Sequence, residues 1–108
     1  MNMTLREICI AANVSRRAVQ GYEKAGLVKP SGKTERGYLI YDEKSQERIR
    51  QIKLYQELGF QIKEIKEIID APNDIVKGAL VIQVKKLREQ GENIEVLIGK
   101  AQELIEKL

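Results

Sequence analysis

The chain has 108 residues, of which 43% are hydrophobic and 32% charged, and its formal net charge is +3. This length suits one compact domain with at most one additional long element. One cysteine and no histidine exclude an internal disulfide framework and a zinc site of the usual Cys/His kind. No stretch approaches the roughly 18 consecutive apolar residues of a membrane span, and charges at Arg6 and Glu7 interrupt any signal-peptide pattern. We therefore expect a cytoplasmic protein without a metal or other cofactor.

The basic excess lies in the first 40 residues, which hold seven Lys and Arg against three Asp and Glu. Residues 41–72 hold six against seven, and residues 73–108 hold six against six. A basic excess confined to one end of the chain suits a polyanionic partner.

The first predicted helix begins at Thr4, because Thr4 and Glu7 have the spacing of a capping box. The apolar residues that follow recur with helical spacing at Leu5, Ile8, Cys9 and Ala12. Cys9 lies on this apolar side, so we expect a buried and unreactive thiol. Asn13 tolerates the left-handed conformation of a tight turn directly after the helix.

A short basic helix is predicted after this turn, with Ser15 as its N-cap and Gly26 as the left-handed residue that ends it. Helical spacing places Ser15, Ala18, Val19, Tyr22 and Ala25 on one side. The other side has no carboxylate and consists of Arg16, Arg17, Gln20, Gly21 and Lys24. Arginine forks suit phosphate oxygens and guanine edges, and glutamine suits adenine edges. Taken alone, the segment fits a DNA-reading surface and an ordinary solvated face equally well.

Two helices joined by a tight turn form the helix-turn-helix arrangement, whose second helix enters a major groove. Residues 29–37 contain one Pro and two Gly and predict a loop. The runs on either side, Leu27–Val28 and Tyr38–Tyr41, are β-prone. We expect them to pair as a small hairpin, or wing, with Lys33 and Arg36 near its tip.

A third helix is predicted from the Asp42 cap to about Leu58, where Gly59 ends it. Its buried stripe consists of Ile49, Ile52 and Tyr55. A fourth, short helix follows, with apolar residues at Ile62, Ile65, Ile68 and Ile69.

The break at 71–73 is followed by a long helix over Asp74 to Leu108. Its apolar residues form an a/d heptad seam at Leu80, Val84, Leu87, Gly91, Ile94, Ile98, Ala101, Ile105 and Leu108. A helix of about 50 Å is too long for a small domain to cover, so a second copy of the chain is the simplest partner. Gly91 leaves a helical hairpin as the alternative, but the seam keeps its register across the glycine and favours one helix.

Residues 4–70 resemble the MerR family of bacterial transcription regulators in an ordered set of motifs: Asn13-Val14-Ser15-x-Arg17, Tyr22-Glu23, Gly26-Leu27, Pro30, Gly37-Tyr38-x-x-Tyr41 and Leu58-Gly59-Phe60. The resemblance implies a mainly α fold, with a winged helix-turn-helix domain over residues 1–71 and an antiparallel coiled-coil dimerisation helix over 72–108. It also implies a homodimer that binds and distorts a pseudo-palindromic promoter element in double-stranded DNA, with RNA polymerase as a further partner.

The resemblance assigns roles position by position: Ser15 as cap, Arg17 as recognition-helix arginine, Tyr22 as a phosphate contact, and Tyr38 and Tyr41 as wing residues. The family usually has Arg-Tyr where this chain has Gln20-Gly21, and Asn and Arg where it has Arg36 and Leu39. The predicted DNA-binding set is Ser15, Arg16, Arg17, Gln20, Tyr22, Lys24, Lys33, Arg36, Tyr38 and Tyr41. The predicted dimerisation set is Leu80, Val84, Leu87, Ile94, Ile98, Ala101 and Ile105.

Alternatives remain at this point. A protein-interaction module would use the coiled coil alone, and an excisionase-like architectural protein would bind DNA without activating transcription. We expect no catalytic site, because there is no histidine and no Gly-rich phosphate loop. Neither the flanking cysteines of metal-sensing relatives nor the extra domain of relatives that sense organic compounds occurs here, which fits both a short member and a fragment of a longer regulator.

Overall fold

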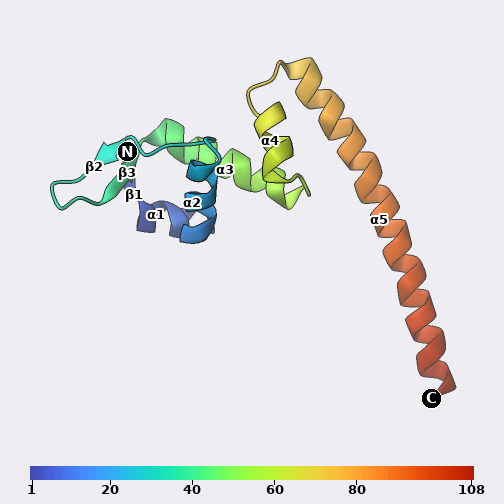
Figure 1. Cartoon of the computed structure of the whole chain (residues 1–108). Coiled ribbons are helices and arrows are strands. Elements are labelled where there is room, and N and C mark those ends of the chain that lie inside the picture. Colours follow the sequence, from blue (N-terminus) through green and yellow to red (C-terminus); the bar gives the residue numbers. More distant parts are fainter. The chain divides into compact units, whose positions relative to one another are not determined.

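The computed structural model describes all of residues 1–108 as two compact units, Met1–Asp70 and Ala71–Leu108. The second unit is a single helix, α5 (Asn73–Lys107). The first unit contains strand β1 (Met3–Thr4), helices α1 (Leu5–Ala11) and α2 (Arg16–Lys24), strands β2 (Gly32–Lys33) and β3 (Leu39–Tyr41), and helices α3 (Glu43–Glu57) and α4 (Ile62–Ile68) (Figure 1). The predicted mainly α class, with a small hairpin wing and a long C-terminal helix, is confirmed.

The predicted N-caps of the first three helices are all present. The Thr4 hydroxyl accepts from the Glu7 N–H at 3.3 Å, while the Glu7 carboxylate accepts from the Thr4 N–H at 2.9 Å. The Ser15 hydroxyl accepts from the Ala18 N–H at 3.0 Å, and Asp42 caps α3 through the Ser45 N–H. Each cap satisfies a backbone donor that the helix itself leaves free, and so fixes the residue at which the helix begins.

The first three helices end at left-handed residues, as predicted: Asn13 (φ 51°), Gly26 (φ 77°) and Gly59 (φ 100°). After α2, the Gly26 N–H donates to the Glu23 carbonyl and the Leu27 N–H to the Tyr22 carbonyl, both at 3.0 Å. This pair of bonds is a Schellman motif, which reverses the chain within two residues. The same motif after α1 makes the tight turn of the helix-turn-helix.

The wing exists, but its first strand is not where the sequence predicted it. Leu27–Val28 forms no strand, and β2 lies at Gly32–Lys33, inside the predicted loop. The Schellman turn places Leu27 in the core, where it is 6% exposed, and Pro30 has no N–H to give to a ladder. Pairing begins only at Ser31, whose N–H donates to the Ile40 carbonyl at 2.8 Å.

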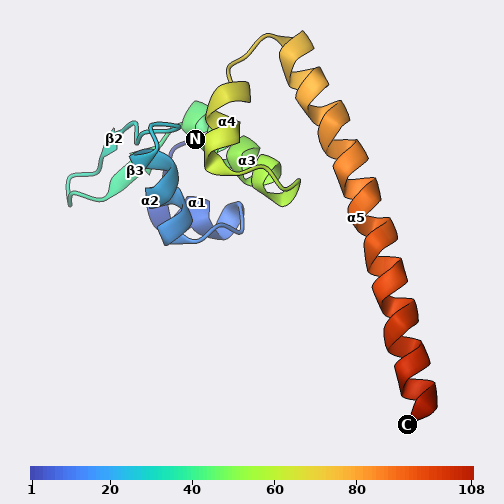
Figure 2. The same ribbon diagram turned by 45° about the vertical axis from the view of Figure 1, so that its right-hand side comes forward.

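Strand β1 was not predicted. It pairs antiparallel with β3, so that Met3 lies opposite Tyr41 and Thr4 opposite Ile40, and the sheet order is β1-β3-β2. Two residues give almost no alternating pattern from which a strand is recognised. The pairing attaches the start of α1 to the base of the wing, while the loop between β2 and β3 projects beyond the helices (Figure 2).

The core of the first unit lies where its helices meet β3. Its largest fully buried side chains come from every helix of the unit and from β3: Tyr22, Tyr41, Ile8, Ile49, Ile52, Ile65 and Val19. Cys9 is half-buried, whereas we expected it to be buried. Partial burial raises the pKa of its thiol, with a smaller opposing effect from Arg16, so the thiol stays protonated and weakly nucleophilic.

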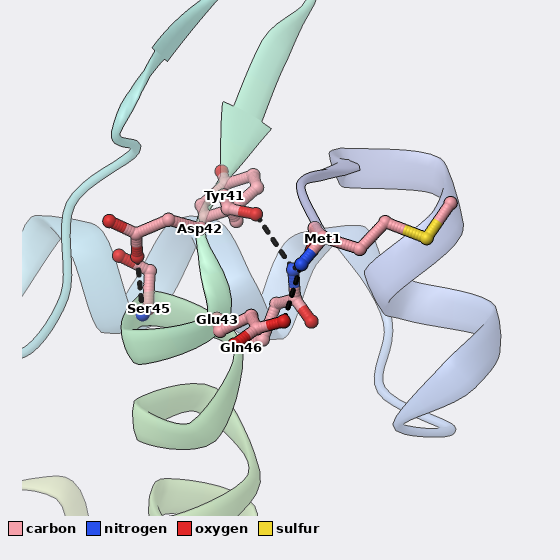
Figure 3. Close-up of polar contacts among 6 residues, drawn as sticks. All are labelled: Met1, Tyr41, Asp42, Glu43, Ser45 and Gln46. Carbon is pink, nitrogen blue, oxygen red and sulfur yellow. Dashed lines mark hydrogen bonds and ion pairs between the residues drawn. The ribbon is translucent and has the colours of Figure 1, made fainter.

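Gln46 is a buried polar residue of α3 that the sequence analysis did not single out. Its side-chain amide donates to the Tyr41 carbonyl at 2.8 Å and to the Met1 carbonyl at 2.7 Å (Figure 3). It lies one helical turn before Ile49, on the same buried stripe. The amide satisfies one carbonyl at the end of the central strand β3 and one just before β1, and so joins α3 to the sheet.

Arg48 of α3 connects three parts of the first unit. Its guanidinium donates to both Asp70 carboxylate oxygens, at 2.6 and 2.7 Å, and its Nε donates to the Leu27 carbonyl at 2.9 Å. The pKa of Asp70 is lowered, chiefly by its hydrogen bonds from Arg48. The bidentate pair thus holds Asp70, two residues after α4, against α3, and the Nε bond joins α3 to the turn after α2.

We predict that Asp70→Asn lowers the free energy of unfolding at pH 7 by about 0.5–1 kcal/mol, because the Asp70 side chain is largely exposed and the pair is partly screened. A carboxyl whose pKa is lowered by folding stabilises the fold above its unfolded-state pKa and loses that effect as the pH falls through its folded-state pKa. Urea unfolding at pH 7 and pH 3 checks this. A difference between the two proteins that was as large at pH 3 as at pH 7 would contradict it.

Helix α5 runs without a break through Gly91, as the register of the seam predicted (Figure 1). Pro72 occupies its N-cap position, and the Ile75 and Val76 N–H groups donate to the Pro72 carbonyl. None of the helices, α5 included, combines the length and the apolar content that crossing a membrane requires.

Candidate nucleic-acid interface

The exposed face of α2 is basic and free of carboxylates. All five residues that the sequence assigned to it are exposed: Arg16, Arg17, Gln20, Gly21 and Lys24. None of the four side chains other than that of glycine makes a hydrogen bond or ion pair within the chain, so these four functional groups are free to meet a ligand. The opposite side of the helix holds Val19 and Tyr22 in the core, which fixes the direction in which the basic face points.

The turn that precedes α2 is held from outside the helix-turn-helix. The Lys53 ammonium group of α3 donates to the Asn13 carbonyl. Ser15 is exposed, but its hydroxyl is occupied by the Ala18 N–H. Ser15 therefore acts first as a cap, and its part in DNA binding stays a prediction.

The wing presents three of the predicted residues. Lys33 lies in β2 and Arg36 in the turn that joins β2 to β3, where Gly37 adopts φ 85°. Tyr38 is 62% exposed, and its backbone is fixed by the Thr34 hydroxyl and by the Thr34 N–H. The wing thus offers two cations and an exposed phenol ring, as expected.

Tyr41 was predicted to contact DNA, and the structure places it in the core instead. It is 0% exposed, and its hydroxyl donates to the Glu23 carboxylate. Burial, and then the hydrogen bond to Glu23, raise the pKa of its hydroxyl. The alternation of β3 directs Tyr41 inward, which the Gly-Tyr-x-x-Tyr spacing alone did not reveal.

Tyr22 is likewise buried, at 2% exposed, and its hydroxyl donates to the Gln56 side-chain oxygen at 2.6 Å. Burial, with a smaller contribution from the Glu57 carboxylate, raises the pKa of Tyr22. A phosphate contact would need the same hydroxyl proton. The ring is a core residue, and the phosphate role implied by the resemblance would require the bond to Gln56 to break.

The two wing tyrosines give a matched pair of predictions. Tyr41→Phe removes a buried hydrogen bond and should lower the free energy of unfolding by about 1 kcal/mol without changing DNA affinity. Tyr38→Phe should leave stability unchanged and weaken DNA binding by about 1 kcal/mol, because the exposed hydroxyl is free to reach a phosphate. Thermal melting and duplex titration of both variants check this. If Tyr41→Phe weakened DNA binding and left stability unchanged, the Tyr41 hydroxyl would be a DNA contact.

Arg6 is a basic residue that the sequence analysis did not assign to the site. It is exposed in the first turn of α1 and lines a cavity together with Arg16 and Tyr38. The basic excess of the first 40 residues was the only sequence signal that included it.

No group of three or more His, Cys, Asp or Glu side chains lies close enough to hold a metal ion.

The predicted dimerisation residues lie along α5, and most of them are exposed to solvent in the single chain. Ile94 is 56% and Ile105 69% exposed. Val84, Leu87, Ile98 and Ala101 are also exposed, and only Leu80 is half-buried. A row of exposed large apolar side chains along a helix is typical of a surface that meets another chain.

Comparison with known proteins identifies the class of this fold. The profile of the MerR HTH family regulatory proteins matches residues 3–72, and that of the MerR DNA-binding region matches residues 46–108. The chain therefore belongs to the MerR family, as the sequence motifs suggested.

Individual relatives agree with this assignment. The chain is 33% identical over 98 residues to the transcriptional activator Mta of Bacillus subtilis. The match covers 91% of the chain and 38% of Mta. A MerR-family regulator from Bacillus cereus superposes with a TM-score of 0.86 at 27% identity, covering 99% of this chain and 82% of that one. The N-terminal part of the B. subtilis multidrug transporter activator, MtaN, gives 0.75 at 30% identity, covering 95% and 97%. The chain spans about two fifths of the length of the curated relatives that it matches.

Proposed function

We propose that this chain is a MerR-type transcription regulator that binds a pseudo-palindromic promoter element as a homodimer. The observation that supports this most strongly is the exposed face of α2. It carries Arg16, Arg17, Gln20 and Lys24 with no carboxylate and no internal partner, on the second helix of a helix-turn-helix.

The division of roles follows from the chemistry of these groups. Arg17 and Gln20 lie on the exposed face of α2, and their side chains suit base edges in a major groove. Lys33 and Arg36 on the wing, and Lys24 at the end of α2, suit phosphate oxygens, which position the protein without reading sequence. The proposed DNA-binding residues are the predicted DNA-binding set without Tyr41. Tyr22 supports the site from the core.

The homodimer is supported by the apolar surface of α5. Large apolar side chains are exposed along this 35-residue helix, and isolated helices are only marginally stable in water. A second α5 that packs antiparallel along the heptad seam would bury this surface and present two copies of α2 to one duplex.

Salt-dependent binding to duplex DNA tests the proposal. Each phosphate that the protein neutralises contributes about −0.9 to the slope of log K against log salt concentration, so several contacts per chain should give a slope steeper than about −4. A protein-interaction module would show weak or no duplex binding, with no such slope. That result would refute the proposed function.

The proposal also covers promoter distortion, contact with RNA polymerase, the cellular compartment and the absence of catalytic activity. Distortion of the promoter and contact with RNA polymerase are expected from the family, as is action in the cytoplasm, where promoter DNA is accessible. We propose no catalytic activity, in line with relatives described as transcription regulators. Footprints with and without polymerase distinguish a regulator that remodels its promoter from an architectural DNA binder.

A further inference from the structure

A cavity of about 470 Å³ lies at the base of the wing. Three segments that are distant in the sequence line it: the first turn of α1, the start of α2, and residues 37–39 of the wing. The polar side chains that it brings together are those of Thr4, Arg6, Arg16 and Tyr38. Arg16 also belongs to the basic face of α2, so the cavity adjoins the surface proposed to read DNA.

The lining of this cavity is positively charged. It contains two arginines and no acidic residue, and neither guanidinium makes a hydrogen bond or ion pair within the chain. The Glu7 carboxylate is close by, but it is bound to the Thr4 N–H as part of the α1 cap and does not line the cavity. An anion placed here would meet two free guanidinium groups and no opposing carboxylate.

A second, larger cavity of about 860 Å³ provides a contrast. It lies between residues 28–31 and α3, and it is lined by three basic and three acidic side chains: Lys29, Lys44, Arg48, Asp42, Glu47 and Asp70. Arg48 and Asp70 already pair with each other there. Its charges are balanced, so it offers no comparable attraction to an anion.

The fold itself holds the two arginines beside the wing. Pairing of Thr4 with Ile40 attaches the start of α1 to β3, and Thr4 is also the residue that caps α1. Ser15 caps α2, so Arg16 is the first residue of that helix. Both arginines are therefore attached to fixed helix starts, and less backbone freedom is lost when they bind.

We propose that Arg6 and Arg16 together bind one phosphate of the DNA backbone at the base of the wing, with the Tyr38 hydroxyl as a third donor. This inference rests on the proposed function, because it names a contact within the same complex. It adds Arg6, a side chain that neither the α2 face nor the wing tip includes. The contact would fix the register of α2 on the duplex without reading a base.

Arg6→Ala tests the assignment, with Arg50→Ala as its control, because Arg50 is an exposed arginine of α3 that does not line the cavity. Arg6→Ala should weaken binding about five- to tenfold at low salt, equally for specific and unrelated duplexes, and make the salt slope shallower by about one per bound chain, or about two for the dimer. Arg50→Ala should leave both quantities near the wild-type values. Arg6→Lys should keep the slope and recover part of the affinity, since it keeps the charge and loses the fork.

Duplexes with one neutral methylphosphonate at each position in turn locate the phosphate. One position per half-site should weaken wild-type binding strongly and Arg6→Ala binding less, because Arg16 and Tyr38 still contact that phosphate. Identical methylphosphonate profiles and salt slopes for wild type and Arg6→Ala would overturn this inference while wild-type DNA binding upholds the proposed function. A wild-type protein that binds no duplex would overturn both. Thermal melting confirms that the variants are folded.

Discussion

Replacing Ile94 with Asp should convert a dimer into a monomer and reduce operator binding more than a hundredfold, because two half-sites lose the advantage of being held together. Ile94 lies on the predicted seam and is 56% exposed in the single chain, so the substitution costs little within one chain. In a two-fold symmetric dimer it places two carboxylates in an apolar contact, where an unpaired charge is strongly unfavourable.

Val96→Asp is the matched control for this experiment. Val96 is also an apolar residue of α5, with 57% exposure, but it lies two positions from Ile94 and therefore on the other side of the helix. Sedimentation should show monomers for Ile94→Asp and dimers for Val96→Asp. If both variants were dimers, Ile94 would not be an interface residue. If both were monomers, the interface would include the side of α5 that carries Val96 as well as the predicted seam.

Arg17→Ala should weaken binding to the specific site by about 1–3 kcal/mol, with a much smaller loss on unrelated DNA. Arg17 is exposed, has no partner in the chain, and is directed away from the core by the burial of Val19 and Tyr22. A bidentate arginine contact to a base edge discriminates between base pairs, and alanine removes both of its hydrogen bonds.

Lys24→Ala serves as the comparison for Arg17→Ala, because it removes the same charge from the same exposed face. Lys24 lies in the last turn of α2 and should contribute a uniform loss on all duplexes together with a shallower salt slope. Competition titrations with specific and scrambled duplexes separate the two patterns. If Arg17→Ala weakened both duplexes equally, Arg17 would be a phosphate contact and another residue would read the bases.

Much of this fold was accessible from the sequence because its helix boundaries depend on local chemistry. Thr4, Ser15 and Asp42 cap helices through bonds to residues three positions away. Asn13, Gly26 and Gly59 end helices because they adopt positive φ. Such interactions span a few residues, so a pattern of residue types is sufficient to predict them.

The errors concern contacts between residues that are distant in the sequence. Strand β1 pairs with β3 across more than 30 positions, and two residues contain too little pattern to reveal this. Tyr41 and Tyr38 both follow the wing loop, yet only the pairing of β3 decides that Tyr41 is in the core and Tyr38 is not. The cavity formed by Arg6, Arg16 and Tyr38 depends on that same pairing, which explains why Arg6 was not recognised as a candidate.

Selection of bound sequences from random duplex DNA, combined with the mass of the complex in solution, tests the central claim most directly. We predict an enriched inverted repeat that is bound by two copies of the chain. Its half-sites should face the same side of the duplex, so that two α2 helices enter successive major grooves. If no sequence were enriched, or if one chain bound a single asymmetric site, the proposed function would be contradicted.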